Sequence, residues 1–287
     1  EEEYSEKRNE ILQAQWRNKA VTDTYDPGST FKILTASMAL EEKAITVDST
    51  FYCPGYRMVE GWPQPIKCWY YPRAHGSQNL YQAIQNSCNP AFIDIGQAVG
   101  AKTFLEYYKA FGLDEPTGID LPGEGESIFH SEEQFLSNKV DLATASFGQN
   151  FQISPLQLIT AVSAVANGGN LMKPYIVKEI LDSDGNIVES TEPTVVRQVI
   201  SEETSELMCD ILETVVSEGT GKNAYVAGYH IAGKTGTSEK KAKQAETGRN
   251  DLRISSFIAF APADDPQVAV LVILDEPTVQ PVTGGIT

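Results

Sequence analysis

Apolar residues recur at helical spacing in five segments of the first 216 residues. These segments are 30–40, 79–85, 101–111, 155–167 and 201–216. The first is apolar on most of its sides, which predicts a helix buried in a core. The fourth has the clearest boundaries, because Ser154 is a favourable N-cap, Pro155 suits the first turn, and Gly168-Gly169 follows its end.

Strand signals gather near the end of the chain. Three segments rich in β-branched and aromatic residues predict strands at 229–238, 254–260 and 267–274. Turn residues fill 261–266, and a connection this short predicts an antiparallel hairpin. Helical segments followed by an antiparallel sheet predict the α+β class, with the sheet flanked by helices beside an all-helical lobe.

Two further segments lack a regular pattern. Residues 47–76 are rich in Pro, Gly, Tyr and Trp and predict a folded loop, whereas residues 240–251 are polar and predict a mobile loop. No internal repeat and no long linker divides the chain. We therefore expect a single domain over residues 1–287.

The charge balance excludes one class of partner. The chain carries 22 Lys and Arg against 39 Asp and Glu, a net charge of −17. This field repels nucleic acids and anionic membrane surfaces. The longest aliphatic run, residues 268–274, is far shorter than the roughly 20 residues that span a membrane. Because residue 1 is not Met, we expect that an anchor or a targeting signal can lie outside this sequence.

Ser29 and Lys32 are the first candidates for chemistry. Their spacing places a hydroxyl and an amine one turn apart on the same face of a helix. A lysine serves as a base at neutral pH only when its pKa is lowered, and the apolar helix 31–40 supplies the desolvation that lowers it. Lys234 is a candidate for a second cation with the same effect. The alternative interpretation is a helix cap followed by an exposed lysine.

The run Lys234-Thr-Gly-Thr237 combines a cation with two hydroxyls on a predicted strand. Side chains alternate along a strand, so Lys234 and Gly236 share one face while Thr235 and Thr237 share the other. Without a side chain, Gly236 lets a ligand approach the backbone closely. An unpaired strand edge also offers N–H and C=O groups to an extended peptide. The alternative is an ordinary glycine turn after a strand.

Ser87 and Asn89 offer a hydroxyl and an amide two residues apart, in a segment before Pro90 where we expect a cleft loop. A hydroxyl can relay protons and an amide can hold a substrate amide. Two other stretches repeat these spacings. Residues 77–79 fit the start of a helix instead, and residues 238–241 lie in the polar loop, where we expect a solvated surface.

Taken together and in this chain order, the three motifs resemble the active-site motifs of penicillin-binding proteins and serine β-lactamases. They are Ser29-Thr-Phe-Lys32, Ser87-Cys-Asn89 and Lys234-Thr-Gly-Thr237. Their wider context is similar to the transpeptidase domain of class B penicillin-binding proteins. The segments that carry this likeness are 25–32, 86–92, 146–150 and 232–239. The resemblance covers most of the chain and implies the fold of that superfamily.

A finer likeness lies in the loop. Cys53-Pro-Gly, Ile66-Lys-Cys-Trp69 and His75-Gly76 are similar to division and sporulation enzymes of spore-forming Gram-positive bacteria, the stage V sporulation protein D type in particular. The family implies an N-terminal membrane anchor, a non-catalytic module upstream and an extracytoplasmic location. It also implies a sheet strand before residue 1.

The resemblance implies that Ser29 attacks the D-Ala-D-Ala end of a peptidoglycan stem peptide while Lys32 takes the hydroxyl proton. The backbone N–H groups of Ser29 and Thr237 then form the oxyanion hole. Ser87 passes the proton to the leaving amine, and Asn89 holds the substrate amide. β-Lactams are expected to acylate Ser29 by the same route.

The third motif takes the substrate-binding part of this mechanism. The resemblance implies that Lys234 keeps the local field positive and that Thr235, Gly236 and Thr237 bind the substrate, the two hydroxyls holding its terminal carboxylate. No cofactor is required for this chemistry. The implied partners are peptidoglycan stem peptides, β-lactams and a glycosyltransferase of the wall-synthesis complex.

Cys53, Cys68 and His75 fall within one loop-rich stretch and are the ligand types of a structural zinc site. Their spacing is not that of a CxxC knuckle, so two alternatives remain open. These are a Cys53–Cys68 disulfide, which suits a protein outside the cytoplasm, and free thiols in the core. Cys88, an acidic residue such as Asp94, or water could complete a metal site.

Other functions share parts of this pattern. A D,D-carboxypeptidase or a serine β-lactamase shares the acylation half, although no deacylating glutamate motif surrounds Glu132-Glu133. A β-lactam-sensing receptor domain would be acylated without turning over a peptide. A scaffold module with a vestigial site is disfavoured by three intact motifs. The remaining cysteine, Cys209, is expected in the core of a helix.

Overall fold

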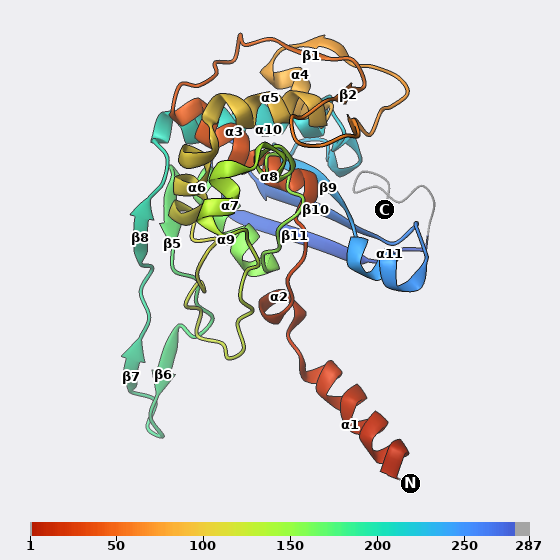
Figure 1. Ribbon diagram of the computed structural model, residues 1–287. Coiled ribbons are helices and arrows are strands. Elements are labelled where there is room, and N and C mark those ends of the chain that lie inside the picture. Colours follow the sequence, from red (N-terminus) through yellow and green to blue (C-terminus); the bar gives the residue numbers. More distant parts are fainter. Residues whose placement is uncertain (1, 279–287) are drawn as a thin grey trace.

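Helix α3, Lys32–Glu41, lies at the centre of the computed structural model, which describes residues 2–278 (Figure 1). Every residue from Lys32 to Leu40 is buried, as the apolar sequence predicts. One turn of 3-10 helix, η1 (Gly28–Phe31), precedes it and carries Ser29. Three long helices pack around α3, namely α5 (Asn89–Val99), α9 (Pro155–Ala166) and α10 (Glu202–Ser217).

A three-stranded antiparallel sheet lies beside this helical core. Its order is β11-β10-β9, formed by β9 (Ala232–Glu239), β10 (Arg253–Ala261) and β11 (Val268–Asp275). All three strands are confirmed, although β9 begins three residues later than the predicted 229–238. Helix α10 and η1 both pack against β9, which places the third motif next to Ser29. The α+β class is confirmed.

The two faces of β11 differ. Ala269, Leu271 and Ile273 are partly buried against the core. Their neighbours on the other face are exposed, namely Val268, Val270, Val272 and Leu274. Among the described residues, β11 pairs with β10 only.

Several helices were not expected from the sequence. Helix α5 begins at Asn89 with Pro90 in its first turn, so Asn89 belongs to a helix and only Ser87 and Cys88 form the loop before it. The pattern Asn-Pro resembles a turn, but proline at the start of a helix leaves no hydrogen bond unmade. The others are α1 (Glu2–Trp16), α2 (Lys19–Thr22), α7 (Glu132–Ser137), α8 (Lys139–Ala145) and η2 (Lys222–Ala224).

The stretch 47–76 folds over α5 as an irregular loop with two small ladders (Figure 1). Strand β1 (Phe51–Cys53) pairs with β4 (Gly76–Gln78), and β2 (Tyr56–Arg57) pairs with β3 (Ile66–Lys67). The expected folded loop therefore contains short strands, and it runs beside the second motif. Helix α4 (Leu80–Gln85) leads from β4 to Ser87.

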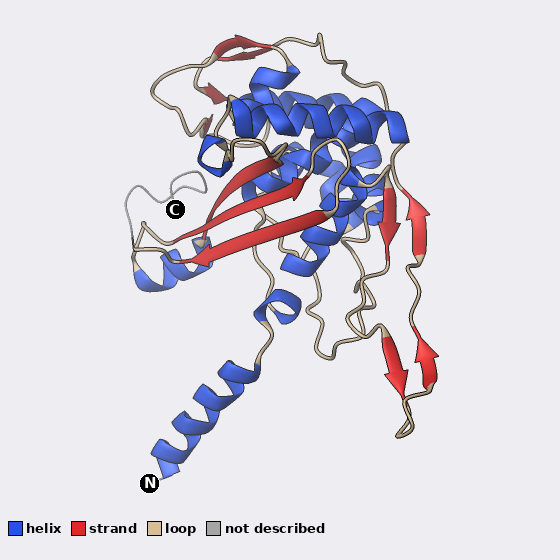
Figure 2. Ribbon diagram, turned by 180° about the vertical axis from the view of Figure 1, so that it is seen from behind, coloured by secondary structure: helices blue, strands red, loops and turns tan. Residues whose placement is uncertain are grey.

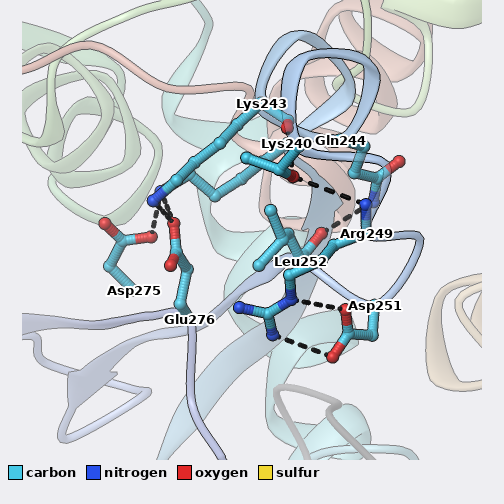
Figure 3. A network of polar contacts seen from close by, with 9 residues as sticks. Lys240, Lys243, Gln244, Arg249, Asp251, Leu252, Asp275 and Glu276 are labelled. Atoms are coloured by element: carbon cyan, nitrogen blue, oxygen red, sulfur yellow. Dashed lines mark hydrogen bonds and ion pairs between the residues drawn. The ribbon is translucent and has the colours of Figure 1, made fainter.

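The segment 240–251 is not the irregular loop that its polarity predicts. It contains helix α11, Lys241–Thr247. Polar contacts join α11 and its flanking residues to the neighbouring strands (Figure 3). Lys240 contacts Asp275 at 2.7 Å and Glu276 at 2.6 Å, and Lys243 also pairs with Glu276. The sequence prediction failed here because these partners are distant in the chain.

The remaining elements lie on one side of the molecule, the left in Figure 1, and their strands lie on the right in the reverse view of Figure 2. They are α6 (Ala101–Ala110), β5 (Asn170–Met172), β6 (Glu179–Leu181), β7 (Ile187–Ser190) and β8 (Val195–Gln198). The hairpin β6–β7 extends away from the core. In the part of the chain that the structure describes, no helix is both long enough and apolar enough to cross a membrane.

Candidate active site

Ser29 lies on η1 with Lys32 one turn further on, and the Lys32 Nζ is 3.0 Å from the Ser29 Oγ. Gly28 makes this placement possible. Its φ of +59° is accessible to glycine, and a Cβ there would lie 2.7 Å from the carbonyl oxygen of Thr237. With any other residue at position 28, the backbone of β9 could not approach the start of η1 this closely.

The second motif meets Lys32 from the other side. The Lys32 Nζ donates hydrogen bonds to the Ser87 carbonyl at 2.8 Å and to the Asn89 Oδ1 at 2.7 Å, and it lies 3.2 Å from the Ser87 Oγ. Ser87 has a φ of +50°, a conformation uncommon for a side-chain-bearing residue. This turn between α4 and α5 directs both the carbonyl and the hydroxyl of Ser87 towards the amine.

The third motif completes the centre. The Lys234 Nζ lies 2.9 Å from the Ser87 Oγ and 3.1 Å from the Thr235 carbonyl. The hydroxyl of Ser87 therefore stands between the two lysines. The Thr235 hydroxyl is 3.2 Å from the hydroxyl of Thr220, which follows α10 in the chain.

Gly236 is needed for packing between strands and η1, and not only for the approach of a ligand. A Cβ at this position would lie 2.3 Å from the Ser256 Oγ and 2.9 Å from the Thr30 Cγ2. Glycine is thus required because β10 and η1 occupy the space beside it. The sequence-based reason, close approach of a ligand, misses this contact.

Burial sets the protonation of the two lysines. It lowers the pKa of Lys32 from 10.5 to about 8, against the opposing effect of the nearby Cys88 and Cys68 side chains. It also lowers the pKa of Lys234 well below its usual value, and the charge on Lys32 lowers it further. Two buried amines at a shared hydroxyl disfavour double protonation, and the expectation that Lys234 keeps the local field positive stays a prediction.

A cleft of about 1720 Å³ opens over these groups. Six of the eight predicted catalytic and substrate-binding residues line it, while Lys32 and Lys234 are buried beneath its floor. The six are Ser29, Ser87, Asn89, Thr235, Gly236 and Thr237. The structure therefore brings all eight together.

Neither competing match forms the catalytic centre, although Glu239 and Lys241 of the second line the cleft. Asn79 caps α4 in a reciprocal pair with Gln82, as the sequence indicates for residues 77–79. Ser238 is buried on β9, so the expectation that residues 238–241 form a solvated surface is wrong for this residue. It belongs to the strand because its backbone pairs with Ile254 of β10.

A second cluster lies directly behind Ser87. Cys53, Cys68, His75 and Cys88 bring three sulfurs and one imidazole nitrogen within 4.8 Å of one another. The Cys68 Sγ is 3.5 Å from the His75 Nδ1. A hydrogen bond from Cys88 lowers the pKa of Cys68, and the same contact raises the pKa of Cys88.

The cluster bears on the alternatives left open by the sequence. All three cysteines are buried free thiols, so the Cys53–Cys68 disulfide is absent from the described structure. Asp94 is not part of the cluster, because its carboxylate pairs with Arg57. Cys88, one of the options for a fourth ligand, is the residue that joins the other three. Cys209 lies apart in α10, buried as expected.

Sequence reasoning missed a polar group at the far wall of the cleft. Asp141 and Asn150 both line the cleft, and the Asn150 Nδ2 donates to the Asp141 Oδ1 at 3.3 Å. His130 lies 3.5 Å from the other oxygen of Asp141. Residues 146–150 carried the family likeness, but nothing in the local pattern indicates that Asp141 and His130 meet them.

Comparison with known proteins assigns this chain to a family. A family model described as the penicillin binding protein transpeptidase domain matches residues 1–286. The chain belongs to this family. Stage V sporulation protein D of Bacillus subtilis is 45% identical to this transpeptidase domain over 263 residues. The match covers 91% of this chain but 40% of that relative, so the chain spans less than half of its length.

Solved structures support the same assignment. The D,D-transpeptidase domain of a peptidoglycan glycosyltransferase from Eggerthella lenta superimposes with a TM-score of 0.83 at 30% identity, covering 94% of this chain and 67% of that one. Penicillin-binding protein 3 from Mycobacterium tuberculosis, complexed with ampicillin, gives 0.81 at 28% identity, covering 91% and 58%. The resemblance drawn from the three motifs is confirmed at the level of the family and fold.

Proposed function

We propose that this chain is the catalytic domain of a D,D-transpeptidase that cross-links peptidoglycan stem peptides through an acyl-enzyme on Ser29. The observation that carries the proposal is the 3.0 Å contact between the Ser29 Oγ and a buried amine, that of Lys32. An alcohol next to a desolvated lysine is the arrangement that an activated nucleophile requires. Family membership agrees with it.

In the acylation step, the Ser29 Oγ attacks the carbonyl of the penultimate D-Ala while neutral Lys32 accepts its proton. The N–H groups of Ser29 and Thr237 receive the oxyanion. Ser87, which lies between Lys32 and Lys234, passes the proton to the leaving D-Ala nitrogen as the C–N bond breaks. Asn89, fixed by Lys32, holds the substrate amide.

The substrate is an anion, and the protein carries a net charge of −17. Local groups decide its binding, because ionic screening limits a net charge to a Debye length of about 8 Å. Thr235 and Thr237 would bind the terminal carboxylate, with the amine of Lys234 beneath them. A β-lactam would acylate Ser29 by the same steps and remain attached.

Intact-protein mass spectrometry tests the acyl-enzyme. Benzylpenicillin should add its mass once to the wild type, on the peptide that contains Ser29, and not to the Ser29→Ala variant. Ser77→Ala removes an exposed serine outside the cleft and should be acylated like the wild type. Equal behaviour of the wild type and Ser29→Ala would contradict the proposal.

Acyl transfer separates this function from its alternatives. With a thioester analogue of the stem peptide and an amine acceptor, a transpeptidase forms the amide product. A D,D-carboxypeptidase releases only the hydrolysed acid, and a receptor domain is acylated without releasing a peptide product. A β-lactamase would turn over a chromogenic cephalosporin rapidly, whereas we expect a lasting adduct.

We further propose that Cys53, Cys68, His75 and Cys88 hold a structural zinc ion. Three thiolates and one imidazole are a common ligand set for structural zinc, and their ligand atoms already lie within 4.8 Å of one another. The burial of the three thiols fits a closed site without an open position for substrate. When bound, the ion would stabilise the loop and supply no step of the reaction.

Elemental analysis together with a thiol count tests the metal site. Protein purified without chelator should contain about one zinc per chain, and Cys53→Ser should lose it. Cys209→Ser changes a buried cysteine in α10 and should retain the metal. Metal-free protein with all thiols reduced, or with an oxidised Cys53–Cys68 pair, would contradict the zinc proposal.

The relatives support a proposal for the setting of the domain. We propose that residues 1–287 form one transpeptidase domain of a longer protein, anchored in the membrane with this domain on the extracytoplasmic side, and acting with a glycosyltransferase. The likeness to stage V sporulation protein D favours a role in spore or septal wall synthesis. Fractionation of the full-length protein and co-purification of its partner test this placement.

A further inference from the structure

Trp69 is an exposed indole held in a fixed orientation. Its side chain lines the catalytic cleft and is 57% exposed. Nevertheless its Nε1 donates a hydrogen bond of 2.8 Å to the carbonyl of Asn86, the residue before Ser87. The backbone beside it is also fixed, because Cys68 donates to the Gly55 carbonyl at 2.8 Å. An anchored aromatic ring that faces a substrate cleft is suited to recognition.

A carboxylate lies on the same side of the cleft. Glu218 follows α10 and lines the cleft, and its Oε2 accepts from the Gln85 Nε2 at 3.4 Å. The Thr220 N–H donates to the Gln85 carbonyl at 3.0 Å. Trp69 and Glu218 are therefore both attached to the end of α4, just before Ser87. In the part of the chain that the structure describes, no lysine or arginine forms an ion pair with Glu218.

The second substrate of the proposed reaction is the amine acceptor, and an aromatic ring and a carboxylate are groups suited to bind it. An amine acceptor is a cation at neutral pH, and whatever positive charge Lys32 or Lys234 carries at the centre of the site repels it. A cation approaching Ser87 is stabilised by the face of an indole and by an unpaired carboxylate. Glu239 also lines the cleft, but it already pairs with Arg253, so that carboxylate is compensated.

We propose that Trp69 and Glu218 form the subsite that receives the ammonium group of the acceptor strand. The inference rests on the proposed transpeptidase function. After the ammonium releases one proton to solvent, the amine attacks the Ser29 ester carbonyl. The new C–N bond forms, the bond from the carbonyl carbon to the Ser29 Oγ breaks, and the second amine proton passes through Ser87 and Lys32 to the Oγ.

The partition of the acyl-enzyme between aminolysis and hydrolysis measures this subsite. Because both products come from one acyl-enzyme, their ratio does not depend on how much protein is folded or how fast it is acylated. The probe acceptors are an N-acetylated peptide with one free lysine side chain, which is cationic, and methoxyamine, which is uncharged at neutral pH. Product ratios are read by mass spectrometry over a range of acceptor concentrations.

Trp69→Ala and Glu218→Gln should each lower the aminolysis ratio for the cationic peptide about tenfold and lower that for methoxyamine far less. Trp69→Phe should restore part of the loss, since a smaller aromatic face remains. Trp16→Ala, which removes a 72% exposed indole of α1, and Glu206→Gln are matched controls outside the cleft. Both controls should keep the wild-type ratio.

Three outcomes overturn the assignment. An unchanged ratio in Trp69→Ala and Glu218→Gln removes the subsite while leaving the transpeptidase intact. An equal loss for both acceptors shows that the variants only displace Ser87. A loss seen solely with an acceptor that carries a disaccharide assigns the indole to the glycan. If the wild type forms no acyl-enzyme, the proposed function itself fails and the subsite fails with it.

Discussion

The sulfur of Cys88 lies within 4.8 Å of the sulfur of Cys68, and this contact joins the loop 47–76 to the second motif. Cys88 is the middle residue of Ser87-Cys-Asn89, and its neighbours both contact Lys32. The cluster and the catalytic centre therefore share one stretch of backbone. We therefore expect a change in either to affect the other.

Cys88→Ser should impair acylation although the residue does not line the cleft. Loss of the cluster would displace Ser87 and Asn89, and a shift of about 1 Å in a catalytic group can reduce a rate about 100-fold. The second-order rate constant for a fluorescent penicillin measures the effect. Cys209→Ser is the matched control, and equal rates in the two variants would contradict the coupling.

The rate of acylation should depend on pH through Lys32. The neutral amine is the active form, and the pKa of Lys32 is lowered to about 8 by burial. The neutral fraction therefore falls as pH drops below this value, and the rate constant should fall about tenfold per pH unit there and level off above it. The rate constant is to be measured between about pH 6 and pH 9. A rate constant that does not change with pH over this range would contradict the assignment of Lys32 as base.

Ser87→Ala should reduce turnover more than it reduces stability. The substitution removes the hydroxyl shared by Lys32 and Lys234 but retains the carbonyl that Lys32 also uses. Loss of a proton relay typically reduces a rate by about 10²–10⁴-fold. Thioester turnover and thermal unfolding measure the two effects. A loss of melting temperature that accounts for the whole loss of turnover would contradict the relay.

Gly28→Ala should disrupt the site through steric contact. The variant must adopt a φ of +59° and place its Cβ 2.7 Å from the Thr237 carbonyl oxygen. The conformation alone costs about 1–2 kcal/mol. Gly248→Ala is a matched control, because its φ is +69° and no atom lies within 4 Å of the added Cβ. Unfolding free energies should separate the two variants, and Gly28→Ala alone should lose penicillin acylation.

Glu41 at the end of α3 should stabilise the start of α10. Its carboxylate accepts from the Ser201 N–H at 3.0 Å, the Ser201 hydroxyl at 2.8 Å, and the Thr204 hydroxyl. Partial burial alone would raise the pKa of Glu41, but the hydrogen bonds from Thr204 and Ser201 lower it. Glu41→Ala should lower the free energy of unfolding by about 1 kcal/mol at neutral pH.

Acid should remove this contribution of Glu41. Because its pKa is lower in the folded state, its stabilisation is present above the unfolded pKa and is lost as pH falls through the folded pKa. The difference in unfolding free energy between the wild type and Glu41→Ala should shrink in acid. Glu42→Ala changes the next glutamate as a control. A difference that stays constant down to acid pH would contradict the assignment.

Local patterns predict much of the catalytic centre and much of the core. The apolar run of α3 indicates a buried helix, and the three motifs in chain order indicate which residues meet. By contrast, α11 is polar, and its partners Asp275 and Glu276 are distant in sequence. Cys88 was one of several options, because only the tertiary fold decides whether it or Asp94 reaches His75. The chemical roles of the site residues remain predictions.

Among the described residues, one edge of β11 carries backbone groups without a strand partner, and the outward face bears four branched side chains. Such an edge is a template for another strand. Two molecules that meet there would join their sheets edge to edge through β11, the edge opposite β9. Concentrated samples should then self-associate while every copy keeps an accessible catalytic serine, so kinetic work on this domain belongs at low protein concentration.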